Sequence, residues 1–127
     1  MPVRDPFQYA VWRVVPRLER GECLNAGVVL YCRTRGFLDA RIALDEQRLA
    51  ALAPGADRAG IEQHLSALAG IAAGVPADDP IASLPQSERF HWLVAPSSTV
   101  VQPSPVHTGL CEDPAATLDH LFARLVA

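Results

Sequence analysis

The run FQYAVWRVV at residues 7–15 constrains the fold more than any other part of the chain. It is rich in aromatic and β-branched residues and too short for an independent helix, which predicts a β-strand that ends at Pro16. Successive side chains of a strand point to opposite faces of its sheet, and here both faces are apolar. One face carries Phe7, Tyr9, Val11 and Val15, and the other carries Ala10, Trp12 and Val14. A strand of this kind belongs in the centre of a sheet that is covered on both sides.

Two further runs of strand-forming residues follow the first. They are AGVVLYCR at residues 26–33 and FLDARI at residues 37–42, and the turn sequence Thr34-Arg35-Gly36 separates them. The segment Phe7–Ile42 therefore predicts an antiparallel meander of three strands.

A second group of strands is predicted over Arg89–Gln102. The run RFHWLVA at residues 89–95 alternates in the manner of a strand, and a turn at Pro96 leads into STVVQ at residues 98–102. These two runs predict a second hairpin. Because Trp12 and Trp92 each lie on an apolar strand face, we expect both indole rings in or against the core.

Three segments predict helices. Asp45 can cap a short helix that carries Leu49 and Leu52, and Asp113 followed by Pro114 marks the start of the last helix. The longer helix between them carries one apolar stripe, formed by Ile61, Leu65, Leu68 and Ala72. We therefore expect a single α+β domain over residues 1–127, with an antiparallel sheet of about five strands and about three helices packed mainly on one face.

All eleven cationic side chains are arginines, because the chain contains no lysine. This composition excludes pyridoxal Schiff bases, lysine general bases and the phosphate-binding lysine of a P-loop, since a guanidinium cannot replace the lysine amine. The net charge of −3 argues against general affinity for nucleic acid. The N-terminal residues lack the pattern of a signal peptide, and no apolar run approaches the roughly 20 residues of a membrane span. We expect a cytoplasmic protein with reduced cysteines and no membrane contact.

The segment from Arg89 to Pro114 has the composition of a binding or catalytic site. Four prolines fix its backbone, and polar side chains stand among them, namely Ser98, Thr99, Gln102, Ser104, His107 and Thr108. Two interpretations stay open for these groups: hydrogen bonds to the local backbone, or recognition of an external molecule. The segment also supplies the residue types of a catalytic triad, in Ser98 or Ser104, His107 and Asp113, but it has no nucleophile elbow such as G-x-S-x-G.

Arginines near the ends of the predicted strands form a second set of candidates. Arg13 and Arg17 lie in and after the first strand, and Arg89 begins the fourth. Their guanidinium groups could hold a phosphate or the carboxylates of a partner, and the alternative is structural ion pairing with acids such as Glu19 or Glu88. No closely spaced pair of ligands such as C-x-x-C is present, so we expect neither a metal site nor a cofactor.

Two long blocks of the sequence resemble the bacterial proteins grouped as domain of unknown function 3037. The blocks are YAVWRVVPRLERGECLNAGVVLYCR at residues 9–33 and ERFHWLVAPSSTVVQPSPVHTGLCEDP at residues 88–114. The resemblance covers most of the chain, but it implies no activity, cofactor or catalytic residue. It does imply an association, because such proteins look like frequent genomic neighbours of HipA-type kinase domains.

Two functional hypotheses follow. The first is a non-enzymatic binding or adaptor module, whose arginines and Ser98–Thr108 loop contact a partner protein such as a HipA-type kinase. The second is a small enzyme or binder acting on a phosphorylated or nucleotide-like ligand, with His107 as acid or base and with Arg13 and Arg89 holding the anion. The second hypothesis requires a concave pocket where Arg13, Arg89 and His107 converge, whereas the first requires an apolar surface with a polar rim.

Overall fold

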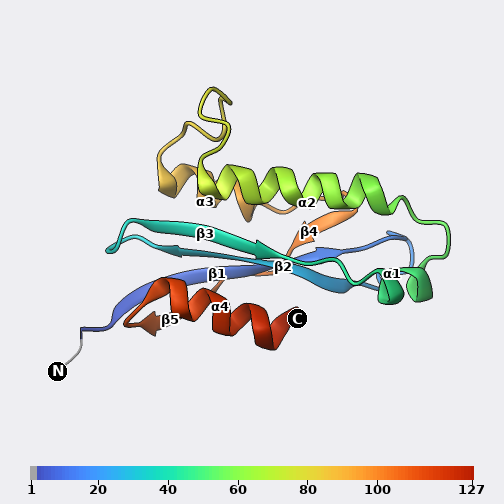
Figure 1. Ribbon diagram of the computed structural model, residues 1–127, viewed down its shortest axis with the longest axis horizontal. Helices are drawn as coiled ribbons and strands as arrows, with labels where there is room; N and C mark the ends of the chain where they lie inside the picture. The colour runs from blue at the N-terminus through green and yellow to red at the C-terminus, as the bar shows by residue number, and fades with distance from the viewer. Residues whose placement is uncertain (1–2) are drawn as a thin grey trace.

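The computed structural model describes residues 3–127, which form an antiparallel sheet with helices on both faces (Figure 1). The sheet has the strand order β3-β2-β1, and two short strands, β4 and β5, both pair with the outer edge of β1. The elements are β1 (Asp5–Val14), β2 (Leu24–Cys32), β3 (Phe37–Ile42), α1 (Glu46–Leu52), α2 (Arg58–Ala73), α3 (Gln86–Leu93), β4 (Val101–Pro103), β5 (His107–Cys111) and α4 (Pro114–Leu125).

The first three strands form the predicted meander. β1 pairs with β2 and β2 pairs with β3, both antiparallel. The turn between β2 and β3 is closed by a hydrogen bond from the Gly36 N–H to the Arg33 carbonyl (3.1 Å), and Gly36 adopts a φ of 59°. A residue without a Cβ takes up this left-handed conformation at the least cost, which explains the glycine.

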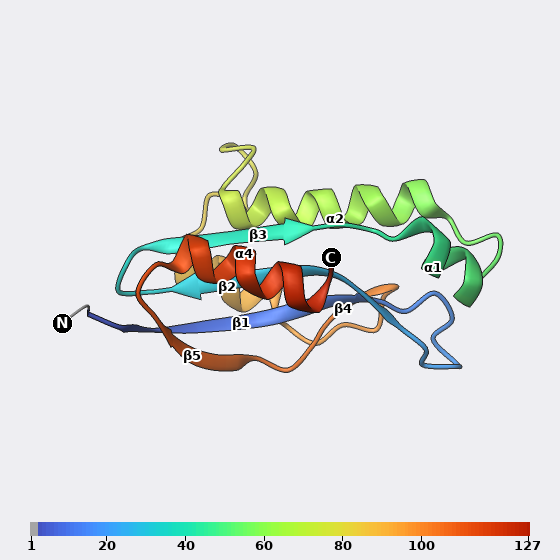
Figure 2. The same cartoon turned by 60° about the horizontal axis from the view of Figure 1, so that its bottom comes forward.

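Each face of the sheet carries its own hydrophobic core, as the two apolar faces of β1 predicted. On one face, the fully buried Trp12 packs in a cluster with Leu65 of α2 and Phe90 of α3. On the opposite face, Phe7 belongs to a second cluster with Leu118 of α4. Figure 2 shows α4 lying over the strands on this side. We refer to the two sides of the sheet as the α2 face and the α4 face.

The three predicted helices are confirmed, together with two of their capping residues. The Asp45 carboxylate accepts the Arg48 N–H at the start of α1, and the Asp113 carboxylate accepts the N–H groups of the first turn of α4. The stripe of α2 is buried as expected, namely Ile61, Leu65, Leu68 and Ala72. Most of the helical packing lies on the α2 face, and α4 covers the other. No helix in residues 3–127 has the length and apolar character needed to cross a membrane.

The prediction of a strand at residues 89–95 was wrong, because residues 86–93 form helix α3. Phe90 and Leu93 are buried by this helix, whereas the Trp92 side chain is 45% exposed and does not lie in the core. A run of seven residues is too short for its apolar spacing to separate a strand from a helix. The described chain therefore has four helices rather than about three.

The predicted second hairpin is also absent, since β4 and β5 pair with β1 rather than with each other. β4 lies beside residues 12–14 and β5 beside residues 5–9, so the two strands follow one another along the same edge. Ser104 fills the gap between them. Its N–H donates to the Val11 carbonyl (2.7 Å), and its hydroxyl accepts the Val11 N–H (2.9 Å) and donates to the Pro105 carbonyl (2.9 Å).

Candidate functional site

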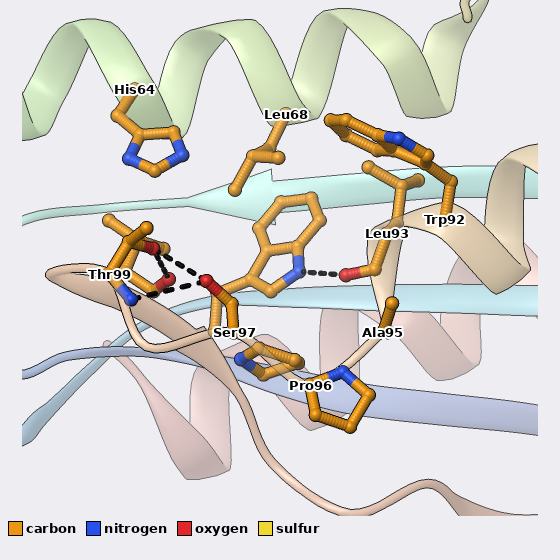
Figure 3. A pocket seen from close by; sticks show the side chains of 11 residues that line it. His64, Leu68, Trp92, Leu93, Ala95, Pro96, Ser97 and Thr99 are labelled. Atoms are coloured by element: carbon orange, nitrogen blue, oxygen red, sulfur yellow. Dashed lines mark hydrogen bonds between the residues drawn. The ribbon is translucent and has the colours of Figure 1, made fainter.

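A cavity of about 310 Å³ opens on the α2 face, between α2, α3 and the segment that joins α3 to β4. Figure 3 shows His64 and Leu68 reaching toward it from α2, and Trp92 and Leu93 approaching from α3. Trp12 of β1 also lines the cavity. Ser97 and Thr99 lie on the side of the connecting segment (Figure 3). Two tryptophans, an imidazole and two hydroxyls therefore surround one hollow.

The position of the Trp12 ring is fixed by a hydrogen bond and by a glycine. The indole N–H donates to the Leu93 carbonyl at the end of α3 (3.2 Å), which ties the sheet to the helix. Gly27 lies opposite Trp12 on β2, and a Cβ at Gly27 would come within 2.9 Å of the indole Cε3. A larger residue at this position would therefore displace the ring that lines the cavity.

The hydroxyl side of the cavity is held by hydrogen bonds within the connecting segment. The Ser97 Oγ and Thr99 Oγ1 atoms are 2.8 Å apart, and the Ser97 hydroxyl also accepts the Thr99 N–H (3.2 Å). The Thr99 hydroxyl reaches the Val101 carbonyl (2.8 Å), and the Gln102 amide donates to the Thr99 carbonyl (2.9 Å). These hydrogen bonds fix the conformation of residues 97–102 beside the cavity.

A second hollow of about 420 Å³ adjoins the first along α2. The two share His64, Thr99 and Val101, and the second extends to Asp57 and Gly60 at the start of α2. We call the pair of hollows the α2 groove. His64 stands at their junction, where its exposed imidazole faces both.

Several residues predicted from the sequence lie away from this groove. His107 and Thr108 are exposed on β5, where the His107 ring lies 5.2 Å from the ring of Tyr9. Arg17 is exposed in the loop after β1, and Ser98 is exposed in the segment before β4. Among the polar side chains predicted to form a site in the Arg89–Pro114 segment, only Thr99 lines the first hollow within the described chain.

The two arginines proposed as anion holders also occupy separate places. Arg13 is partly exposed on β1, opposite Gln102 and Asn25, and it forms no ion pair with any residue in the range 3–127. The Arg89 guanidinium donates to the carbonyls of Leu84 (2.7 Å) and Ala72 (3.4 Å). Arg89 thus bonds one backbone carbonyl at the end of α2 and one in the segment before α3, rather than the acids considered from the sequence.

Arg13, Arg89 and His107 therefore do not form one pocket. Arg89 belongs to α3 on the α2 face, whereas His107 lies against Tyr9, whose ring packs with the cluster on the α4 face. The sheet separates the two side chains. The enzyme hypothesis required a pocket where these three side chains converge, and the described residues form no such pocket.

Sequence reasoning missed His64, which lines both hollows at their junction. The signal was available, since His64 directly precedes Leu65 and lies four residues before Leu68 on the buried stripe of α2. A polar residue that borders an apolar stripe sits at the edge of whatever the helix covers. The incorrect strand assignment placed Trp92 on an apolar face, so its exposure was not predicted.

The cysteines do not contribute to the groove. Cys32 and Cys111 are buried and Cys23 is exposed. Burial raises the pKa of the Cys111 thiol, and the neighbouring Cys32 raises it further. A raised pKa keeps Cys111 protonated and weakly nucleophilic at neutral pH. Residues 3–127 contain no group of three or more His, Cys, Asp or Glu side chains placed to hold a metal ion.

The sheet, its two helical layers and the groove define a small α+β domain with a concave apolar surface. The chain belongs to the family described as Protein of unknown function (DUF3037), whose model matches residues 9–126. This match confirms the resemblance seen in the sequence and covers nearly the whole chain. No curated protein and no solved structure matches the chain significantly.

Proposed function

We propose that this protein is a non-enzymatic binding or adaptor module, and that the α2 groove receives an apolar segment of a partner protein. The supporting observation is Trp92, which leaves 45% of its surface exposed at the rim of a cavity lined by the buried Trp12. Tryptophan is among the residues that contribute most to binding energy when a partner covers them. An exposed indole beside an apolar hollow is an arrangement suited to that role.

The composition of the groove supports a protein partner. Its interior is formed by apolar side chains such as Leu68, Leu93 and Val101, and its rim carries His64, Ser97 and Thr99. An apolar centre with a polar border is the usual anatomy of a protein–protein interface. The two adjoining hollows, about 310 and 420 Å³, follow one another along α2, which suits an extended segment of a partner.

A non-enzymatic role is supported by the separation of the candidate catalytic groups. His107 and Arg89 lie on opposite faces of the sheet, and the hydroxyl of Thr99 is engaged with the local backbone. A HipA-type kinase domain is the partner that the family resemblance suggests. We place the interaction in the cytoplasm, where the free cysteines of the described chain would stay reduced.

The test begins with co-purification from the native host and identification of the captured proteins by mass spectrometry, with a HipA-type kinase as the first candidate. The affinity of the purified partner is then measured by calorimetry for Trp92→Ala and for Leu110→Ala. Leu110 is a matched control because it is 64% exposed on β5 and does not line the groove. We expect Trp92→Ala to weaken binding at least about tenfold with little loss of stability. Equal affinity for both variants would contradict the proposal.

A further inference from the structure

A separate cavity of about 350 Å³ lies on the other side of α3, and it shares no lining residue with the α2 groove. Its polar lining consists of Gln8, Tyr31, Arg33, Ser87 and His91. Its volume is within the range of small-molecule sites. We call it the Arg33 cavity.

The fold brings these polar groups together from three elements. Gln8 of β1 and Tyr31 of β2 are direct partners in the sheet. Arg33 lies in the turn directly after β2 and lines the same cavity. Ser87 and His91 are four residues apart on α3, which places them one turn apart on the same side of the helix. Both sets of side chains line one cavity between α3 and these strands.

Every polar side chain of the Arg33 cavity can donate a hydrogen bond, and none of its lining residues is acidic. Within residues 3–127, the Arg33 guanidinium has no ion pair. Arg35, two positions along, illustrates the contrast, because it pairs with the Asp5 carboxylate. The Arg33 side chain is exposed, as are Gln8, Ser87 and His91, so these donors are open to a ligand from solvent. A guanidinium with amide, hydroxyl and imidazole donors beside it is suited to an oxyanion.

The remaining wall of the cavity is apolar. It is formed by Phe90, which is 4% exposed, together with Val94 and Val106. The ring of Phe90 lies 5.3 Å from that of Tyr31, so two aromatic rings stand beside the donors. A ligand that fills this space needs an apolar part in addition to its anionic group.

We infer that the Arg33 cavity binds a phosphomonoester carried on an aromatic or apolar group. Arg33 holds the phosphate oxygens together with Ser87 and His91, and the carrier packs against Phe90. A phosphate offers three terminal oxygens, which matches donors that arrive from three elements, whereas a carboxylate would be satisfied by the guanidinium alone. The inference is independent of the α2 groove and of any protein partner.

The test uses phenyl phosphate, inorganic phosphate and benzoate as probes, with binding followed by calorimetry and by amide NMR shifts. We expect phenyl phosphate to bind most tightly and to shift the amides of α3 and of residues 31–33. Arg33→Gln and Ser87→Ala should each weaken it, with Arg33→Gln the larger effect at about tenfold or more. Arg17→Gln is the matched control, since Arg17 is an exposed arginine outside the cavity, and Trp92→Ala should bind phenyl phosphate normally.

Three results would overturn the inference. The first is equal weakening by Arg33→Gln and Arg17→Gln, which would indicate nonspecific attraction. The second is benzoate binding as tightly as phenyl phosphate, which would remove the selectivity for phosphate. The third is inorganic phosphate binding as tightly as phenyl phosphate, which would remove the role of the apolar wall.

Discussion

Ser104 connects the two short strands at the edge of the sheet, and its replacement by alanine tests whether it is structural. The side chain is 4% exposed, and its hydroxyl is the acceptor for the Val11 N–H in the middle of β1. Ser104→Ala removes that acceptor and leaves the backbone Ser104 N–H to Val11 carbonyl bond in place. The sheet should keep its strand order while losing the two hydrogen bonds of this hydroxyl.

The expected cost is dominated by the Val11 N–H. A buried donor left without an acceptor costs about 1–3 kcal/mol, and Val11 is 7% exposed. The second partner, the Pro105 carbonyl, belongs to an exposed residue and can bond water instead, so its loss adds little. We expect a loss of about 2 kcal/mol in the free energy of unfolding. For a domain of this size, that loss lowers Tm by about 8 °C.

Denaturant unfolding and amide hydrogen exchange measure the two parts of this prediction. Ser104→Ala should lower the unfolding midpoint, and exchange of the Val11 amide should accelerate more than that of other β1 amides. Ser98→Ala is the control, because Ser98 is exposed and its change should stay within about 0.5 kcal/mol. If the two serine variants have the same midpoint, and Val11 exchange is unchanged, the hydroxyl does not stabilise the edge and the reasoning is refuted.

Three other predictions follow from burial. Trp12→Ala should cost about 3–5 kcal/mol in denaturant unfolding, and Trp92→Ala less than about 1, so similar costs would contradict their different exposure. Gly27→Ala should cost about 1–3 kcal/mol because its Cβ would lie 2.9 Å from the Trp12 ring, and an unchanged midpoint would show that the ring can move freely. The raised pKa of Cys111 means that the unfolded thiol ionises first, so stability should fall as the pH rises through the ordinary value of 9.0. Cys111→Ala should reduce that fall, and at neutral pH native protein should react with maleimide at Cys23 and not at Cys111.

The meander and three helices were predictable because their sequences carry strong local signals. β1 is apolar on both faces, and α2 has a long apolar stripe. Asp113 followed by Pro114 is a specific signal for the first residues of a helix. Each of these signals comes from residues that are close together in the sequence. They can therefore be recognised without knowledge of the tertiary packing.

The elements that were missed depend on tertiary contacts. β5 contains Gly109, which counts against a strand, yet the Phe7 ring lies so close that a Cβ at Gly109 would be 2.7 Å from its Cζ. Glycine is therefore required there by its partner on β1, which the sequence of β5 does not reveal. The same is true of the Arg33 cavity. Its lining residues come from distant parts of the chain and meet only because α3 is a helix that packs against the sheet.

The interrupted edge beside β1 also limits how copies of this protein can associate. An exposed sheet edge can template the addition of a strand from another chain. Along this edge, Pro103 and Pro105 lack the N–H that an added strand would need, and the Ser104 hydroxyl is turned inward to Val11. On this edge of the described chain, only the five residues of β5 present an unbroken row of backbone groups. We expect this arrangement to keep β1 inside the sheet and to disfavour edge-to-edge pairing on this side.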